Sequence, residues 1–434
     1  MSISVIGLVL SLLLLIYLAF KGHSTIWIAP VCSLVIAIFG SMNLVDTILK
    51  TYMAGAAKYF QTWFPVFFLG AVYGAVMDKT GAAKSLANKV IQIIGEKHAI
   101  AVVVAIGLLL TYGGVSLFVV VFVTYPIAYE LYKAANLSRT LIPGAIALGT
   151  YGVTMTCFPG TPSIQNLIPT EYLGTTPTAA PLLGIIAGIM IFIPGYIYLQ
   201  HRAKQTRAAG MGFEEDEEYE AKKVKDDRTY PSWHWLSGLI PIFFVILLLT
   251  AFKTPVVLAL LAGILLCCLL NINQGETLLD SFTEGAKSSM LPILATCSVI
   301  GYGAVVKASP GFTVLTELAM NVPGGVLISE VIAINILSGA TGSSSAGLAI
   351  SLSTLGPTWL AQAAAQGISP EIVHRIATVA SGGLDTLPHN APTQTVLALS
   401  HCTYKQSYKD ICYTSLVFPL ITATILAVVL TIIY

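Results

Sequence analysis

The feature that most constrains this 434-residue chain is a pattern of residues that occurs twice, 229 positions apart. The motif Tyr-Gly-Ala-Val occurs at 73–76 and again at 302–305, in apolar surroundings both times. Three further matches keep the same offset: Gly113 with Gly342, Pro159 with Pro388, and Gln165 with Gln394. Two halves built on one plan, each interrupted by Gly, Pro and polar residues in corresponding places, are typical of secondary transporters.

Charged residues are few and unevenly placed. Only 10% of the residues are charged and the mean hydropathy is +0.81, whereas soluble domains contain about 25% charged residues. A soluble globular fold is therefore excluded. Fifteen of the 43 charged residues (22 basic and 21 acidic) fall within 201–230, and such a run is typical of a solvated linker. We therefore predict a first repeat over 1–200, a charged linker over 201–230 and a second repeat over 231–434.

The composition also argues against several partners and cofactors. The net charge is +1 and no basic stripe is present, so no nucleic-acid partner is expected. The seven cysteines include no Cys-x-x-Cys pair and lie mostly in apolar runs, which is typical of buried thiols rather than of a metal site or disulfide framework. No cofactor is expected. The apolar run 3–20 lacks a basic n-region and a cleavage site, so it is predicted to be a retained first helix.

Ten segments are long enough to cross a bilayer, which takes about 20 mostly apolar residues. Eight of them are continuous, at 2–20, 24–42, 61–78, 178–200, 233–251, 254–271, 288–306 and 409–433. Two more, 141–170 and 371–400, are interrupted by Pro and polar residues. The regions 99–132 and 325–358 each consist of two apolar arms around a small, polar tip. An arm of about 13 residues covers only about 20 Å of a roughly 30 Å core, so we predict re-entrant hairpins.

The predicted fold class is an all-α polytopic membrane protein. It has two inverted repeats, each with about five crossings, one re-entrant hairpin and one broken helix. The amphipathic stretch 81–94 is predicted to lie at the membrane interface.

An odd number of crossings per repeat turns the second repeat upside down, and the distribution of Lys and Arg gives its orientation. With the N- and C-termini outside, 17 basic residues fall on the cytoplasmic side and five fall outside. Without the seven basic residues of the linker the split is still ten to five. We therefore predict that 201–230 is cytoplasmic, that the first hairpin enters from the cytoplasm and that the second enters from outside.

Broken helices at membrane depth are tolerated only beside protein or a cavity, so the two breaks and two tips point to one place near the midplane. Helix N-termini at such breaks offer N–H donors and a partial positive charge that suit a carboxylate. The predicted substrate-binding residues are Gly113, Gly114, Ser116, Thr161, Ser163, Gln165, Asn166, Thr341, Ser343, Ser344, Ser345, His389, Asn390, Thr393 and Gln394. Isolated serines such as Ser11 and Ser33 are predicted to serve helix packing instead.

Asp385 is an ionisable residue within a membrane crossing, which makes it a functional candidate. Burial favours the uncharged form of a carboxyl group, so Asp385 is predicted to carry a coupling proton, with helix capping as the structural alternative. His389 follows four residues later, where the two side chains could meet if the turn is helical. Proton handling and a neutral hydrogen-bonded ring are both open for His389. Arg375, near the outer end of the same crossing, is expected to extend to the surface, with anion binding as the alternative.

The chain resembles the gluconate permease family of the ion transporter superfamily over nearly its whole length. The resemblance is strongest at 338–347 (SGATGSSSAG) and 382–410. Leu-Pro-His-Asn at 387–390 is similar to the hydroxybutyrate permease branch, whereas the sugar-acid branch carries a Ser-His-Val-Asn type of sequence there. The resemblance implies a bacterial inner-membrane carrier that imports small hydroxylated monocarboxylates, such as 3-hydroxybutyrate or gluconate, usually with protons. It also implies that hairpin tips and helix breaks form the substrate and cation site.

Several alternatives stay open at this point. A Na⁺-coupled carrier would use the hydroxyl groups at 343–345. An antiporter of ions alone needs more than one buried carboxylate, and only Asp385 qualifies. An intramembrane enzyme is disfavoured because Glu-x-x-His and Gly-x-Ser-x-Gly motifs are absent, and a channel has no need of duplicated broken helices. Carriers of this kind often form homodimers, but the sequence gives no oligomeric state.

Overall fold

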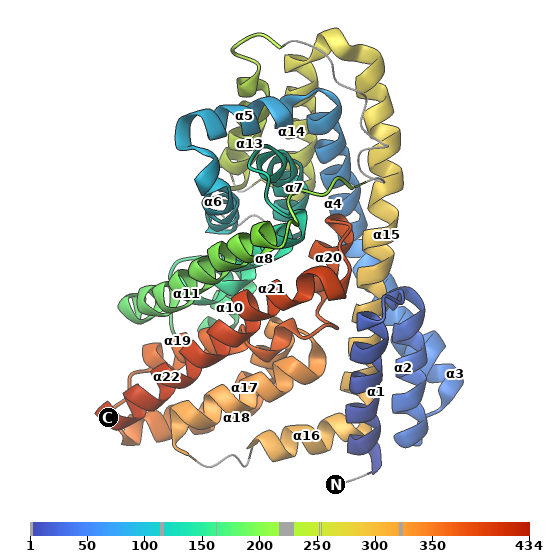
Figure 1. Cartoon of the computed structure of the whole chain (residues 1–434). Coiled ribbons are helices and arrows are strands. Elements are labelled where there is room, and N and C mark those ends of the chain that lie inside the picture. The colour runs from blue at the N-terminus through green and yellow to red at the C-terminus, as the bar shows by residue number, and fades with distance from the viewer. Residues whose placement is uncertain are drawn as a thin grey trace.

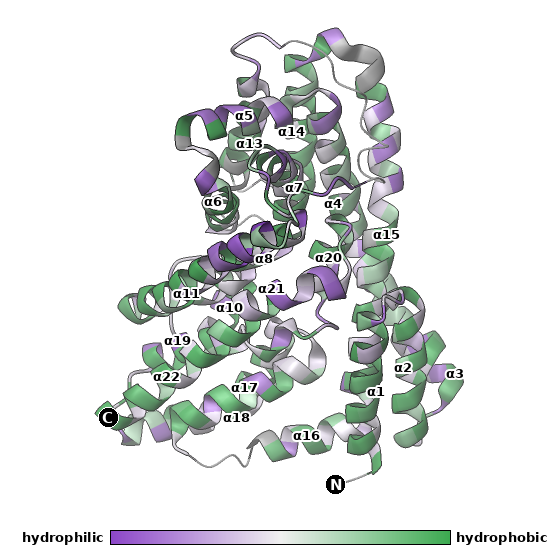
Figure 2. Cartoon of the chain, in the orientation of Figure 1, coloured by the Kyte–Doolittle hydropathy of each residue, from purple (hydrophilic) through white to green (hydrophobic). Residues whose placement is uncertain are grey.

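The computed structural model describes residues 3–112, 117–161, 163–216, 230–250, 252, 254–320 and 324–434. All regular structure in these ranges is helical, which confirms the predicted all-α class. Six segments in the described ranges are long and apolar enough to cross a membrane, namely Ile3–Phe20, Leu44–Lys79, Arg139–Cys157, Pro181–Ala208, Leu278–Ala308 and Tyr404–Ile433. Figure 2 shows how strongly hydrophobic residues dominate these helices. The chain is a multi-pass membrane protein.

The first two helices of each half coincide with predicted crossings, but several are shorter than expected. α1 (Ile3–Phe20) has 18 residues and α13 (Trp235–Thr250) has 16, whereas α2 (Thr25–Phe39) and α14 (Val256–Leu270) have 15 each. Fifteen residues extend about 23 Å, less than the hydrocarbon core. Local residues set these limits: the Ser24 side chain caps the start of α2, and the Asn271 amide bonds back to Cys267 O at 2.8 Å after α14.

Two long helices form the centre of the fold. α4 (Met53–Lys79), preceded by α3 (Leu44–Asp46) and η1 (Thr47–Tyr52), packs along α15 (Gly275–Ala308). In Figure 1, α15 runs along one side of the molecule for most of its height. Their close approach needs glycine, because a Cβ on Gly285 would lie 2.5 Å from Val72 Cα.

The repeated tyrosines lie on this central pair and face the opposite half. Tyr302 Oη of α15 is 3.0 Å from Ser11 Oγ of α1, and Tyr73 of α4 packs beside Gly263 of α14. Both tyrosines are completely buried. The α1–α2 pair therefore packs on α15 and α14 packs on α4 (Figure 1). Ser11 and Ser33 also bond to carbonyls within their own helices, which agrees with the predicted packing role.

The two predicted hairpins are pairs of packed helices. The first consists of α6 (Ala99–Tyr112) and α7 (Leu117–Ala134), and the second of α17 (Val326–Thr341) and α18 (Ser344–Ala365). The arms have 14, 18, 16 and 22 residues, so the expected length of about 13 was wrong. α18 extends about 33 Å and is by length able to cross a bilayer. The first tip, 113–116, lies outside the described residues.

Both predicted helix breaks are present. The first crossing consists of η3 (Arg139–Leu141), α8 (Ile142–Ala147), η4 (Leu148–Gly152) and α9 (Thr154–Cys157), and it resumes as α10 (Ile164–Leu173). The second consists of α19 (Pro370–Ser381), η6 (Leu384–Thr386) and α20 (Ala391–Leu399). Pro159 explains the first break, since proline offers no backbone N–H and disfavours helix in the residue before it. In the second crossing α19 ends before Gly382, and Pro388 follows η6.

The remaining helices complete each half. α11 (Pro181–Ala208) continues into the charged segment, so the first eight residues of the predicted linker are helical. The chain ends with η7 (Tyr404–Tyr408), α21 (Lys409–Cys412), η8 (Tyr413–Val417) and α22 (Phe418–Ile433). The amphipathic stretch forms α5 (Ala82–Ile94), which packs against α7 and α13, while α16 (Pro310–Met320) packs against α1. η2 (Glu96–His98) and η5 (Ile272–Gln274) are short turns.

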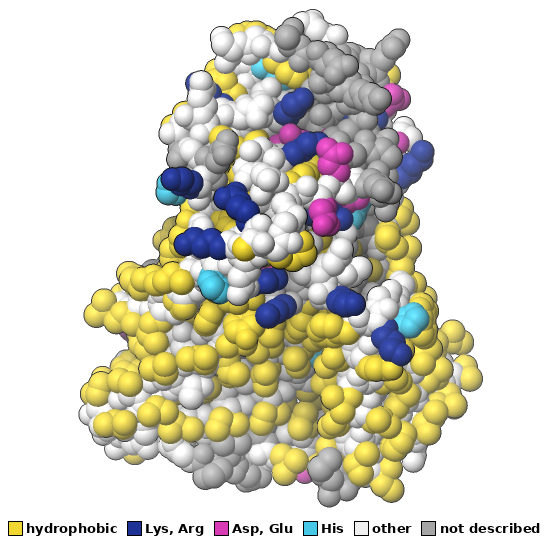
Figure 3. Space-filling view, in the orientation of Figure 1, with side chains coloured by type: hydrophobic (Ala, Val, Ile, Leu, Met, Phe, Trp, Pro, Cys, Tyr) yellow, Lys and Arg dark blue, Asp and Glu magenta, His cyan; other side chains and the backbone are white. Residues whose placement is uncertain are grey.

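Several loops that the distribution of Lys and Arg placed on the same side of the membrane contact one another in the structure. Phe20 at the end of α1 packs edge-on against Tyr408, with ring centroids 5.4 Å apart. Arg139 donates to Ser400 O at 3.2 Å and pairs with Asp216 at 3.4 Å, and Lys133 pairs with Glu215 at 2.6 Å. Figure 3 shows Lys and Arg side chains gathered above a broad zone of hydrophobic ones. Which side faces the cytoplasm stays a prediction.

Candidate functional site

The first break runs from Phe158 to the start of α10. Gly160 has a φ of +81°, which suits glycine, and the chain then turns into α10 at Ser163. The Ser163 hydroxyl donates to Met155 O at 2.7 Å and that of Thr161 to Phe158 O at 3.2 Å. These hydroxyls therefore satisfy carbonyls that the break frees, and they leave the N-terminus of α10 without a side-chain cap.

The second break is closed by Asn390, which caps α20. Its Oδ1 accepts from Thr393 N at 2.8 Å and from Thr393 Oγ1 at 3.0 Å. Its Nδ2 donates to Gly342 O at the tip of the second hairpin, 3.2 Å away. Gln394 accepts from the Tyr404 hydroxyl at 2.6 Å. Asn390 therefore holds the break and the hairpin tip together.

The second hairpin tip is built around Gly342, whose φ is +62°. A Cβ there would lie 2.5 Å from the His389 ring, so only glycine allows this contact. The Ser343 hydroxyl caps α18 by accepting from Ala346 N, and it lies 3.2 Å from Ser345 Oγ. Thr341 Oγ1 bonds to Leu337 O at 2.8 Å.

Among the described residues, one side-chain hydrogen bond joins the first break to this tip. Gln165 Nε2, in the first turn of α10, donates to Ser344 Oγ at 2.7 Å. Both breaks therefore meet the second hairpin tip, as the sequence predicted. The first tip residues Gly113, Gly114 and Ser116 lie outside the described residues, but the preceding Tyr112 has its ring centroid 6.4 Å from that of Phe158. The start of the first tip therefore lies beside the first break.

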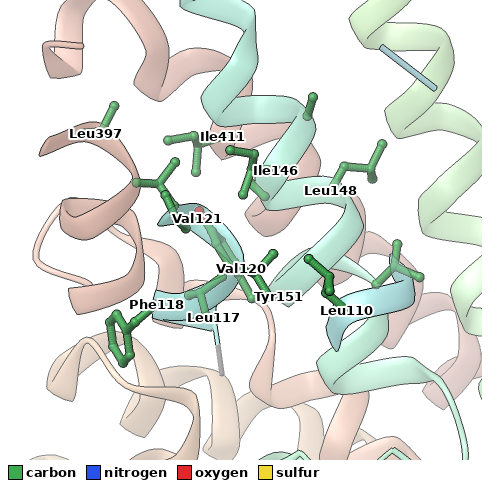
Figure 4. Close-up of a cluster of buried hydrophobic side chains, with 14 of the residues drawn as sticks. Leu110, Leu117, Phe118, Val120, Val121, Ile146, Leu148, Tyr151, Leu397 and Ile411 are labelled. Carbon is green, nitrogen blue, oxygen red and sulfur yellow. The ribbon is translucent and has the colours of Figure 1, made fainter. Parts of the chain in front are cut away.

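Behind this meeting point lies a core shared by both halves. Figure 4 draws Leu110, Val121 and Ile146 of the first half together with Leu397 and Ile411 of the second, and Val121 and Ile146 lie beside Ile411. All five side chains are buried. The polar site is thus supported by tight apolar packing, which fixes the positions of α7, α8 and α20.

Several polar atoms at the site are buried without a hydrogen-bond partner among the described residues. They are Gln165 Oε1, Asp385 Oδ1, both ring nitrogens of His389, Ser338 Oγ and Tyr151 Oη. An unpaired buried polar group costs about 1–3 kcal/mol, and each such group calls for a water, an ion or a ligand. They make this place the candidate binding site.

Asp385 and His389 do not pair with each other in the described structure. Asp385 lies in the 3₁₀ turn η6, where Ser344 and Tyr151 are its neighbours. His389 instead packs beside Tyr302, with ring centroids 5.9 Å apart. Pro388 ends the turn between them, so the helical contact that the four-residue spacing allowed does not form.

Arg375 does not extend to the surface, contrary to expectation. Its side chain is fully buried, as is that of the neighbouring His374. α19 packs against α9, α10 and α11, so this part of the crossing faces protein rather than lipid or water. Asn166, predicted to bind substrate, bonds instead to its neighbours: Nδ2 donates to Thr161 O and Pro177 O, and Oδ1 accepts from Arg375.

Sequence reasoning also missed buried carboxylates. Glu330 of α17 is fully buried, and neither of its oxygens has a hydrogen-bond partner among the described residues. Asp410 is buried as well and pairs with Arg202 at 2.8 Å and Tyr198 at 2.9 Å. The statement that only Asp385 qualifies as a buried carboxylate was therefore wrong. Glu330 could have been found, because it is a lone acid within the apolar run 326–334.

The fold and the site together define a polytopic helical carrier with interrupted helices that meet at one polar site. Comparison with known proteins gives the family. Residues 1–260 match the GntP family permeases. The chain is also 33% identical over 461 aligned residues to "Uncharacterized transporter YxjC" of Bacillus subtilis (strain 168), and the alignment covers 97% of each chain. The chain belongs to the GntP permease family and is a secondary transporter, not an enzyme.

Proposed function

We propose that this permease imports a small hydroxylated monocarboxylate by proton symport across a bacterial inner membrane. The observation that carries the proposal is the group of unpaired buried polar atoms where three helix N-termini meet. The N-termini of α10, α18 and α20 supply N–H groups and partial positive charge for a carboxylate. Gln165 Oε1 is an acceptor suited to a substrate hydroxyl.

The few unpaired polar groups at the site favour a short hydroxy acid over a sugar acid. The His389 ring lies against Gly342 on one side and near Tyr302 on the other, so it forms a wall between the tip and α15. A 3-hydroxybutyrate-like acid has one hydroxyl to satisfy, whereas gluconate has five. The site offers few unpaired acceptors, and the Leu-Pro-His-Asn sequence resembles the hydroxybutyrate branch.

Proton coupling is assigned to Asp385. Its Oδ1 is buried without a hydrogen-bond partner among the described residues, and a lone carboxylate within a membrane protein is expensive. Protonation of Asp385 together with substrate binding would remove that charge before the site closes to one side of the membrane and opens to the other. Na⁺ coupling at 343–345 is the second candidate, because Ser343 Oγ and Ser345 Oγ lie 3.2 Å apart and hydroxyl oxygens suit a small cation.

The inverted repeat is part of the same proposal. Adding 229 to the bounds of α6 (99–112) gives 328–341, and α17 is Val326–Thr341. Adding 229 to the first residue of α10 (164) gives 393, and α20 begins at Ala391. These matches support two halves, over 1–200 and 231–434, that place one hairpin and one broken helix each at the site. A homodimer with both termini outside completes the arrangement we propose.

The test is uptake into proteoliposomes that contain the purified permease. Short 3-hydroxy acids, sugar acids and dicarboxylates are compared, each with an inward proton gradient, with an inward Na⁺ gradient and with neither. We expect accumulation of a 3-hydroxy acid driven by the proton gradient alone. Accumulation that depends on Na⁺ at fixed pH would replace proton coupling by the second candidate. Uptake of neutral solutes in place of carboxylates would overturn the proposed substrate class.

A further inference from the structure

Arg375 is a buried cation that forms no ion pair with a carboxylate among the described residues; Glu371, one turn earlier on α19, accepts from Ala180 N at 3.2 Å instead. Its guanidinium is bound by backbone carbonyls: Nε and Nη2 donate to Ala179 O at 3.1 and 2.7 Å, Nη1 to Cys157 O at 3.3 Å, and Nη2 to Pro177 O at 3.3 Å. Its one strong side-chain acceptor is the neutral amide oxygen Asn166 Oδ1, at 3.1 Å. Carbonyl dipoles solvate the cation, but they do not cancel its charge.

This charge is linked to the candidate site through Asn166. Asn166, which accepts from Arg375, is the residue after Gln165, and Gln165 bonds to Ser344 at the hairpin tip. Arg375 belongs to α19 of the second half, whereas its carbonyl partners lie at the end of α9 and in the connection from α10 to α11. The positive charge is therefore built into the contact between the two halves, next to the first turn of α10.

A purely structural clamp does not need this charge. A buried ion without a counter-ion is costly, and a neutral side chain could donate to the same carbonyls without that cost. The charge becomes favourable when an anion binds nearby. In a medium of effective dielectric constant about 20, two unit charges about 10 Å apart change a binding constant roughly tenfold.

We propose that Arg375 makes the carrier selective for anions without touching the substrate. It acts as a fixed positive charge behind the N-terminus of α10. Asn166 Oδ1 holds the guanidinium there, and His374 supports Asn166, since its Nε2 lies 3.3 Å from the same oxygen and its Nδ1 lies 2.6 Å from Thr175 Oγ1. This inference rests on the proposed function, in which the substrate is an organic anion.

The test compares a carboxylate with its uncharged amide, for example 3-hydroxybutyrate with 3-hydroxybutyramide, as competitors of labelled substrate exchange in proteoliposomes. Arg375→Gln should weaken inhibition by the carboxylate roughly tenfold and leave inhibition by the amide unchanged. Arg375→Lys keeps the charge and should keep the preference for the carboxylate, even if the protein is less stable. A structural role alone predicts equal losses for both competitors in both variants.

Asn166→Asp gives a second, independent readout that does not depend on Arg375 variants folding. It places a carboxylate oxygen where Oδ1 now lies 3.1 Å from the guanidinium, so it neutralises the charge, but it loses the two bonds that Nδ2 donates to Thr161 O and Pro177 O. We expect a roughly tenfold loss in carboxylate affinity, with inhibition by the amide unchanged. An unchanged preference for the carboxylate in both Arg375→Gln and Asn166→Asp would overturn the inference. A wild-type carrier that selects neutral solutes would overturn the proposed function, and this inference with it.

Discussion

Gln165 Nε2 lies 2.7 Å from Ser344 Oγ, although the two residues are 179 positions apart in the chain. The bond connects the broken helix of the first half to the hairpin tip of the second. Ser344 is also beside Asp385, the residue to which we assign proton coupling. A change in the charge of Asp385 is thus one contact away from the first break, which gives substrate binding and proton binding a common structural element.

The first prediction concerns this bond. Gln165→Ala and Ser344→Ala should each weaken substrate binding, because each removes a polar group at the site; a hydrogen bond to a charged group contributes about 1.5–3 kcal/mol. The double variant should lose less than the sum of the single variants, by about 0.5 kcal/mol or more, since the two residues are partners. The affinities of the four proteins of this double-mutant cycle are measured by competition with labelled substrate in exchange.

Ser353→Ala, on the exposed side of α18, is the matched control and should bind like wild type. Additive losses would mean that the bond is absent from the binding conformation.

The second prediction concerns coupling through Asp385. Asp385→Asn keeps the shape of the side chain but is unable to release a proton. Net uptake driven by a pH gradient should therefore fail, while exchange of substrate at equal pH should partly survive. The measurement is the ratio of driven uptake to exchange in the purified variant. Asp280→Asn, at an exposed position of α15, should leave the ratio unchanged.

A capping role for Asp385 predicts another result. Asparagine caps helices about as well as aspartate, so both activities would stay near normal in Asp385→Asn. An unchanged ratio would therefore return Asp385 to a structural role, and coupling would move to His389 or to Na⁺ at the hairpin tip.

Local features of the structure could be predicted from the sequence, because local chemistry determines them. The break at Pro159 follows from the missing N–H of proline, and the turn at Gly342 follows from the freedom of glycine. The polar residues around the breaks indicated the candidate site without any knowledge of contacts. Helix length was less predictable, since the ends of α2 and of the hairpin arms depend on caps and packing as well as on hydrophobicity.

Contacts between residues far apart in the chain could not be predicted from the sequence. Arg375 lies near the end of a crossing, so the sequence favoured a surface position. Its burial follows only once α19 is known to pack against α9 and α11. The role of Asn166 as an acceptor for Arg375 likewise depends on two residues 209 positions apart. Glu330 was visible in the sequence, but nothing local distinguishes a buried acid from one at the membrane surface.

The third prediction concerns orientation. In a background without the seven cysteines, a single cysteine is placed at Glu215 or at Tyr434, and intact cells are treated with a membrane-impermeant thiol reagent. Glu215 and Tyr434 are both exposed side chains, so accessibility from each side decides the result. Only position 434 should react from outside, because the basic residues place the linker in the cytoplasm. Reaction of position 215 in intact cells, with lysed cells as the control for reactivity, would contradict the inverted arrangement.

The fourth prediction concerns Glu330, whose two carboxyl oxygens are buried without partners among the described residues. Burial of an unpaired polar group costs about 1–3 kcal/mol, and replacement by an apolar residue of similar length removes that cost. Glu330→Met should therefore raise the melting temperature of the purified protein, and Glu330→Gln should raise it less. Glu171→Met, at an exposed position of α10, is the control and should have little effect.

We expect that a carboxyl group buried at this cost in stability takes part in transport. Glu330→Met should therefore gain stability and lose driven uptake. A lower melting temperature of Glu330→Met would show that Glu330 has a stabilising partner in the folded carrier. A more stable Glu330→Met variant with full uptake would show that Glu330 has no role in transport.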